Sequence, residues 1–256
     1  MRGGAQSHLM RASDGHFYVV KFQNNPQHVR VLANELMATR LAERVDLPVP
    51  KAEVIDVSQW LIENTPELSV QLAGHAVPCR AGLQFGSRFV VDPLEGHVFD
   101  YLPEPLLAGG AVRNLYAFAG ALAFDKWTCN ANGRQAAFWK KVRERKYWVS
   151  FIDQGYCFNA GEWSFPDSPL RGVYPRNDVY KEVRGWDSFE PWLSRLEELD
   201  SNAIAQRAGE LPPEWYGGDW DALERLVAEL VRRRVRVRDL ITEFHNSSRA
   251  PFPNWR

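Results

Sequence analysis

Apolar and polar positions predict short strands around one helix in the first part of the chain. Alternating residues predict strands at residues 8–12 and 17–22, joined by a Ser-Asp-Gly turn. Residues 51–57 and 84–93 predict two further strands, with a short helix after Ser58, which is a good capping residue. This part therefore reads as a small α+β unit.

One longer helix interrupts these strands. Asn25 can cap it, and Pro26 suits its first position because proline lacks the N–H that would be unpaired there. The following apolar residues keep helical spacing, at Val29, Leu32, Leu36 and Leu41. The sequence Leu-Pro-Val-Pro should end the helix, because a residue before proline is pushed out of helical conformation.

The second part of the chain is mainly helical. Residues 112–128 are apolar on most faces, as expected for a helix buried in a core. Strands are expected at residues 136–140 and 147–153, and helices around 179–184, from 188, over 200–208 and from 219, while residues 97–110 read as a connector. We therefore expect an N-lobe at residues 1–105 and a helical C-lobe at residues 106–256.

Composition excludes few functions. The net charge of −1 gives no reason to expect nucleic acid or an anionic membrane as a partner. No apolar run approaches the roughly 20 residues of a membrane span. Cys79, Cys129 and Cys157 have no metal-ligand spacing, which favours a reduced, cytoplasmic setting.

Lys21 and Glu35 form the first candidate pair. Lys21 lies near the end of an apolar strand, on the same face as Phe17 and Val19. Glu35 lies in the apolar face of the following helix. A strand lysine held by a helix glutamate positions an amine against phosphate oxygens. An ordinary ion pair, or a lysine that extends to the surface, explains the same pattern equally well.

Two other segments suggest phosphate and metal binding. The turn Gly4-Ala5-Gln6-Ser7 could lay backbone N–H groups against a phosphate, although a plain hairpin turn explains it better on its own. Asp153 ends the apolar strand in FIDQG, where Mg²⁺ binding would compensate a buried carboxylate. An aspartate that caps a turn is the alternative.

The segment FDKWTCNANGRQAAFW has the features of a catalytic loop in two registers. Asp125 and Asn130 have the acid-x4-Asn spacing of a phosphotransferase, but Asp125 falls in the last turn of the predicted helix. In the second register Asn132 stands at the reactive turn. An asparagine can orient a hydroxyl group, but it cannot accept its proton at neutral pH.

In this order, the segments resemble the HipA-like kinases and, more distantly, type II phosphatidylinositol 4-kinases and secreted Fam20-type kinases. Gly4-Ala5-Gln6 is similar to the HipA-type Gly-rich loop. ANELMATRLAERVDLPVP is similar to the family's helix, with Glu35 in an Asn-Glu pair, and FIDQG to its metal motif. The similar segments cover roughly the first two-thirds of the chain.

The resemblance implies a two-lobed, protein-kinase-like α+β fold and favours the second register. By that match Asp125 ends a helix, Asn130 leads the catalytic loop and Asn132 stands where the family has its catalytic aspartate. Arg134 replaces a histidine or similar polar residue, and Ala137 replaces the asparagine expected five residues after the aspartate. These departures put phosphotransfer in question, but not nucleotide binding.

The resemblance also implies the ligands and the reaction. We expect ATP and Mg²⁺ in the cleft, and transfer of the γ-phosphoryl group to a Ser/Thr hydroxyl of a protein. The expected binding residues are Gly4, Ala5, Gln6 and Ser7 over the phosphates, Lys21 with Glu35 on the phosphates, and Asp153 on the metal. The alternative is an inactive pseudokinase that serves as a nucleotide-binding interaction module, as in a toxin–antitoxin or stress-response system.

Three accounts of Asn132 remain open. The protein is a pseudokinase, a weak kinase in which positioning and Mg²⁺ supply most of the catalysis, or a kinase carrying an inactivating Asp→Asn replacement. Asp125 is retained as a surrogate acid. Arginines are dense near the C-terminus, where they read as a charged outer face or as contacts to an acidic partner. They are Arg232, Arg233, Arg234, Arg236 and Arg238.

Overall fold

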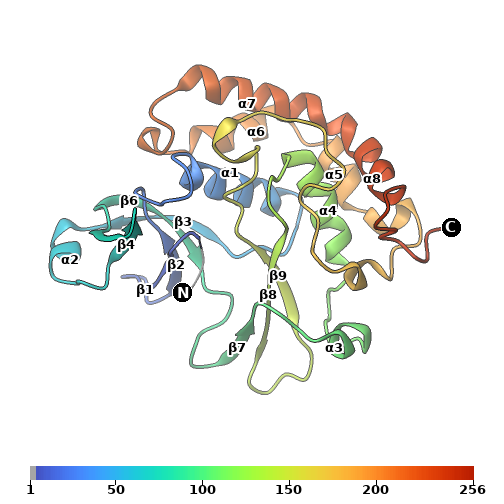
Figure 1. Ribbon diagram of the computed structural model, residues 1–256, viewed down its shortest axis with the longest axis horizontal. Helices are drawn as coiled ribbons and strands as arrows, with labels where there is room; N and C mark the ends of the chain where they lie inside the picture. The colour runs from blue at the N-terminus through green and yellow to red at the C-terminus, as the bar shows by residue number, and fades with distance from the viewer. Residues whose placement is uncertain (1–3) are drawn as a thin grey trace.

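A four-stranded antiparallel sheet forms the first lobe of the computed structural model, which describes residues 4–256. Its strands lie in the order β1 (His8–Arg11), β2 (Phe17–Lys21), β6 (Gly82–Arg88) and β3 (Ala52–Val57) (Figure 1). All pairings are antiparallel. Tyr18 and Val20 pack in a small apolar core on one face of β2, which leaves Lys21 on the other face.

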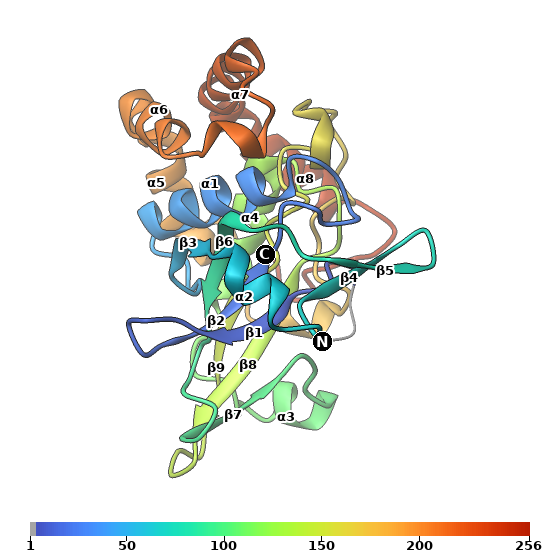
Figure 2. The same ribbon diagram turned by 90° about the vertical axis from the view of Figure 1, so that its left-hand side faces the viewer.

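Helix α1 (Val31–Arg44) lies between this sheet and the helices of the second lobe (Figure 2). Residues 31–39 are all buried, because both lobes pack against them. The helix begins five residues after Pro26, so the prediction of a start at Pro26 was wrong. Asn25 caps a preceding turn instead: its Oδ1 accepts from the backbone N of Gln27 at 2.9 Å, and its Nδ2 donates to Ala5 O at 2.9 Å.

A short helix and a hairpin flank the first lobe. Helix α2 (Gln59–Glu63) is capped as predicted, since Ser58 Oγ accepts from Leu61 N at 3.2 Å. The hairpin consists of β4 (Ser69–Leu72) and β5 (His75–Pro78) and was not predicted. Its strands are four residues each, which is too short for a clear alternating pattern.

A three-stranded sheet and a central helix begin the second lobe. The sheet contains β7 (Gly96–Phe99), β8 (Gln135–Lys141) and β9 (Trp148–Ile152), and the helix is α4 (Ala117–Thr128). Every residue of α4 is buried, as its apolar composition predicted. The expected connector at residues 97–110 instead contains β7 and helix α3 (Glu104–Ala108). Because β7 pairs with β8, the strand pairing favours a lobe boundary before Gly96, ahead of the one expected after residue 105.

Four helices complete the second lobe. They are α5 (Trp192–Glu197), α6 (Ser201–Gly209), α7 (Trp220–Arg233) and α8 (Val237–His245). Asp200 and Asp219 cap α6 and α7, so the predicted starts are correct to one residue. The helix expected around residues 179–184 is a short 3₁₀ turn, Asn177–Tyr180. Within residues 4–256, no helix combines the length and apolar character needed to cross a membrane.

The C-terminal arginines contact the protein itself. Arg233 and Arg236 pair with Asp167, Arg238 pairs with Glu197, and Arg232 pairs with Glu229. Arg234 donates to the carbonyl of Leu199. Arg232, Arg236 and Arg238 remain exposed, as a charged outer face predicts, whereas Arg233 is buried and connects α7 to residue 167.

Candidate active site

Three charged side chains meet where the two lobes face each other. Lys21 stands at the end of β2, Glu35 in the middle of α1, and Asp153 directly after β9. Lys21 Nζ forms ion pairs with Glu35 Oε1 and, at 2.7 Å, with Asp153 Oδ1. The lysine and glutamate that the sequence paired are in contact, and Asp153 from the other lobe joins them.

The cluster carries one amine and two carboxyl groups. Burial raises the pKa of Glu35 above its usual value, although the charge of Lys21 opposes the shift. Burial alone would lower the pKa of Lys21, but Glu35 and Asp153 raise it above its usual value. Burial would raise the pKa of Asp153, but Lys21 outweighs it and the pKa is lowered. Lys21 is therefore charged and Asp153 ionised at neutral pH, so Asp153 can offer its second oxygen to another cation.

Glu35 also fixes the backbone that follows Asp153. Its Oε2 accepts from Gln154 N and its Oε1 from Gly155 N, both at 2.9 Å. A Cβ at Gly155 would lie 2.7 Å from Val31 Cγ2 and 3.1 Å from Glu35 Oε1, so only glycine lets α1 approach this closely. The position of α1 and the position of Asp153 are thus coupled through one carboxylate.

Asn34 extends this coupling further along the chain. Its Nδ2 donates to the carbonyls of Gly155, Cys157 and Ala160 at 2.8–2.9 Å, and its Oδ1 accepts from Trp163 Nε1 at 2.7 Å. The side chain is fully buried, and its two amide hydrogens are shared among the three carbonyls, so all its polar atoms are bonded within the protein. The Asn-Glu pair of α1 therefore holds the whole turn after Asp153.

The predicted phosphate-binding turn lies at the edge of the first lobe. Gly4 is exposed, and Ala5 is tied to Asn25 through its carbonyl. Gln6 has a φ of 46°. Its Oε1 accepts from the backbone N of Gln71 in β4 at 2.6 Å, and its Nε2 donates to Gln71 O at 3.0 Å. The Gln6 side chain therefore holds the turn in shape, and the backbone of residues 4–7 remains the part suited to phosphate contacts.

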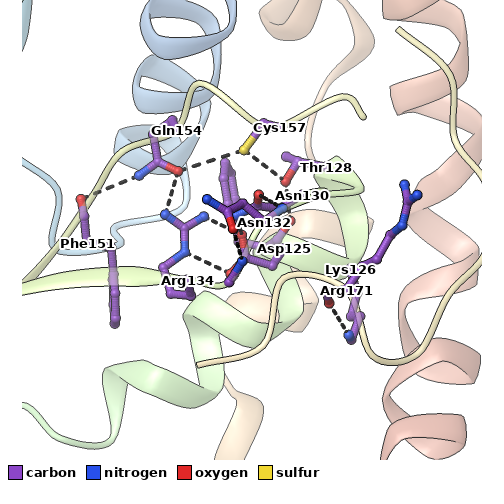
Figure 3. Close-up of polar contacts among 12 residues, drawn as sticks. Asp125, Lys126, Thr128, Asn130, Asn132, Arg134, Phe151, Gln154, Cys157 and Arg171 are labelled. Carbon is purple, nitrogen blue, oxygen red and sulfur yellow. Dashed lines mark hydrogen bonds and ion pairs between the residues drawn. The ribbon is translucent and has the colours of Figure 1, made fainter. Parts of the chain in front are cut away.

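Asp125 is enclosed at the end of α4 (Figure 3). Its Oδ2 accepts from Arg134 Nε at 2.8 Å, and its Oδ1 accepts from Arg134 Nη2 and, at 3.0 Å, from Asn130 Nδ2. The exposed fractions of the Asp125 and Arg134 side chains are 0% and 2%. Both oxygens are therefore occupied and shielded from solvent.

Arg134 connects this loop to the strand that carries Asp153. Its Nη1 donates to Gln154 Oε1 at 2.8 Å (Figure 3). The same nitrogen donates to Ile152 O at 3.1 Å. Burial would lower the pKa of Arg134, but the effect of Asp125 is larger and raises this pKa above its usual value. One guanidinium thus ties the end of α4, the loop and the turn after β9 together.

Asn132 stands at the exposed turn of the loop. Its backbone N donates to Asn130 Oδ1 at 3.1 Å, and its own Oδ1 accepts from Gly133 N at 2.9 Å. Asn130 thus bonds both Asp125 and the backbone of Asn132. Among the described residues, no contact joins Asn132 to Asp153.

Gln135 is a site residue that sequence reasoning missed. It begins β8 opposite Ile152, and its Nε2 donates to Asp153 Oδ2 at 2.7 Å. The two oxygens of Asp153 therefore face different donors, Lys21 on one side and Gln135 on the other. The contact follows from the register of β8 with β9, which places Gln135 opposite Ile152 and next to Asp153.

The segment after the site, residues 164–174, is held against α4 and α7. Lys126 Nζ donates to the carbonyls of Pro169 and Arg171, and burial lowers the pKa of Lys126 to about 8. Arg233 Nη1 pairs with Asp167 at 2.8 Å. A Cβ at Gly172, whose φ is 66°, would lie 2.5 Å from Asp125 Cβ, so the segment packs directly on the loop.

The site contains groups suited to Mg²⁺. Within residues 4–256 no three His, Cys, Asp or Glu side chains converge on a common metal position. Mg²⁺ bound with nucleotides uses one or two carboxylates, and phosphate and water supply its other ligands. Asp153 provides such a carboxylate, with Lys21 on one oxygen and Gln135 on the other.

Solved structures share the fold at low sequence identity. The kinase CtkA from Helicobacter pylori has a TM-score of 0.52 and 13% identity, covering 91% of this chain and 94% of that chain. HipA from Shewanella oneidensis MR-1, solved with HipB and operator DNA, has a TM-score of 0.53 and 14% identity, covering 97% and 67%. Fam20 from hydra, solved with sugar, has a TM-score of 0.51 and 10% identity, covering 96% and 84%. The chain therefore has a two-lobed protein-kinase-like fold.

Sequence comparison identifies the family. No curated protein matches the chain significantly in sequence. The model of the HipA-like kinase family matches residues 1–137, which is more than half of the chain. Lys21, Glu35 and the loop from Asp125 to Arg134 all lie in the matched part. The chain belongs to the HipA-like kinase family.

Proposed function

We propose that the protein binds ATP with Mg²⁺ between its lobes and transfers the γ-phosphoryl group to a Ser/Thr hydroxyl of a protein. The contact of Lys21 with both Glu35 and Asp153 carries this proposal, because it joins an amine and a metal-binding carboxylate across the lobes. Kinases use such a pair to hold the nucleotide phosphates and the metal. Membership of a kinase family supports the same activity.

Each residue has a defined part in this proposal. When ATP binds, the Lys21 amine exchanges its contact with Asp153 for one with the phosphates. Its contact with Glu35 is retained and orients it. The backbone of residues 4–7 covers the phosphates, and Asp153 binds the metal. Bound Mg²⁺ would neutralise charge on the transferred group. Asn132 orients the acceptor hydroxyl by a hydrogen bond.

Asn132 also favours a second function, that of a nucleotide-binding pseudokinase that acts through a protein partner. An amide does not take up the proton of the hydroxyl, and general-base catalysis contributes about 10²–10⁴-fold. Asp125 is an unsuitable substitute, since Arg134 and Asn130 occupy its buried carboxylate. We therefore propose Asp125 as a positioning residue. The net charge of −1 gives no reason to expect a nucleic-acid partner.

Thermal-shift titration with ATP and Mg²⁺ tests the binding part. We expect stabilisation of the wild type, and loss of its Mg²⁺-dependent component in Asp153→Ala. Absence of any shift in the wild type would refute nucleotide binding, and full Mg²⁺ dependence in Asp153→Ala would refute the metal role.

Radiolabel transfer from ATP to a Ser/Thr-containing protein substrate separates the two functions. If the wild type is a weak kinase, Asn132→Asp should raise the rate by about 10²-fold or more. Activity only in Asn132→Asp indicates a pseudokinase or an inactivated kinase. Equal, robust activity in both proteins would show that Asn132 is not at the catalytic position.

A further inference from the structure

The catalytic-loop position that should supply an amide ligand to the metal carries an alanine in this chain. Kinases use a catalytic-loop asparagine for the second metal contact, and the matching residue here is Ala137. Its methyl group is buried in β8, with 5% of its surface exposed. Ala137 pairs with Ser150, which lies in β9 three residues before Asp153. The alanine is therefore inside the strand pair and not at the end where Asp153 lies.

An amide side chain lies nearer to the carboxylate. Gln135 is exposed at the start of β8 and reaches Asp153 Oδ2 at 2.7 Å. Asp153 has a φ of 61°, so the chain leaves its extended course directly after Ile152 and the carboxylate turns toward both β2 and β8. Gln135 and Lys21 therefore flank one carboxylate from opposite sides.

The surroundings of Gln135 suit a hard cation. Lys21 pairs with Asp153 Oδ1, so Oδ2 faces Gln135 and has no ion-pair partner among the described residues. A cation that approaches Asp153 Oδ2 meets the Gln135 side chain, whose amide carries a carbonyl oxygen as well as the observed donor. Mg²⁺ accepts such amide oxygens together with carboxylate, phosphate and water.

We propose that Gln135 is a metal ligand of this site, with its Oε1 binding Mg²⁺ beside Asp153 in place of the missing asparagine. The inference rests on the proposed binding of Mg²⁺ and ATP. Its competing explanation is that Gln135 only positions Asp153 by donating a hydrogen bond. Substitutions that remove the donor but retain an oxygen distinguish these roles.

Mn²⁺ binding in the presence of a non-hydrolysable ATP analogue, followed by electron paramagnetic resonance, measures the site without activity. Gln135→Ala should weaken Mn²⁺ binding about 10-fold or more, as is usual for groups that tune a metal site. Gln135→Glu should bind Mn²⁺ at least as tightly as the wild type, because a carboxylate is a hard oxygen ligand. Gln59→Ala on the exposed surface of α2 is the matched control and should leave Mn²⁺ binding unchanged.

Each outcome has a separate meaning. No Mn²⁺ binding by the wild type with the nucleotide analogue would refute the proposed function itself. Wild-type affinity in Gln135→Ala would overturn the ligand role while leaving the function intact. If Gln135→Glu binds as weakly as Gln135→Ala, Gln135 only positions Asp153 through its donor, and the ligand role is refuted. Gln135 is exposed, so the substitutions should leave the midpoint of urea unfolding close to that of the wild type.

Discussion

Replacing Asp125 by alanine should destabilise the protein strongly, because it leaves the Arg134 guanidinium buried without its counter-charge. The substitution removes acceptors for two Arg134 nitrogens and for Asn130 Nδ2, and neither charged side chain has more than 2% of its surface exposed. Breaking one partner of such a pair costs about 3–5 kcal/mol. For a chain of this size that corresponds to a fall in Tm of roughly 6–20 °C.

Urea unfolding followed by tryptophan fluorescence measures this cost. Asp178→Ala is a suitable control, since Asp178 is 39% exposed and lies 3.5 Å from Arg176; it should cost less than about 1 kcal/mol. Combining Asp125→Ala with Arg134→Met should restore about 1–3 kcal/mol relative to the sum of the single changes, because no charge then remains unpaired.

Two results would refute this reasoning. A loss below about 1 kcal/mol in Asp125→Ala would mean that the pair is not buried as described. Strict additivity in the double variant would mean that Asp125 and Arg134 do not interact. If the Asp125 carboxylate instead accepts the proton of the acceptor hydroxyl, Asp125→Ala would abolish phosphotransfer. The free energy of unfolding would then stay near that of the wild type.

Three further predictions follow from the same region. Lys126 has a pKa of about 8 in the folded protein, below its value in the unfolded chain. Between these two pKa values the unfolded chain binds more protons, so the free energy of unfolding rises with pH. From pH 7 to pH 10 the wild type should gain about 2 kcal/mol relative to Lys126→Met, as measured by urea unfolding. Gly155→Ala should push α1 away from Glu35, cost about 1–3 kcal/mol and abolish the Mg²⁺-ATP thermal shift; an unchanged shift would contradict the coupling. Asp167→Ala should leave global unfolding within about 1 kcal/mol but speed limited proteolysis within residues 164–174; wild-type cleavage rates would contradict the role of its two arginines.

Periodicity predicted the elements whose own residues determine their burial. The strand before Lys21, the buried helix before Asp125 and the capped helix α2 all follow from local pattern. The start of α1 was missed because the Asn25 side chain caps a turn that is also tied to Ala5. Strand β7 was missed because its partner β8 lies far along the chain, and pairing rather than pattern makes it a strand.

The site shows the same division. Lys21, Glu35 and Asp153 were identified because charged residues interrupt apolar patterns, and burying such groups is costly without a partner. Gln135 has no such signal, because an exposed glutamine at a strand start is ordinary. Its contact with Asp153 depends on the register of β8 with β9 and on the positive φ of Asp153, both of which appear only in three dimensions.

The attachment of residues 164–174 has a consequence for regulation. In many kinases the equivalent segment is ordered by a phosphate that arginines bind and that a phosphatase can remove. Here Asp167 presents a permanent carboxylate to Arg233 and Arg236. Since the chain encodes this anion, the contacts of these arginines with the segment do not depend on phosphorylation. We therefore expect control of this protein to act on its abundance or on what occupies the cleft, rather than on a covalent mark in this segment.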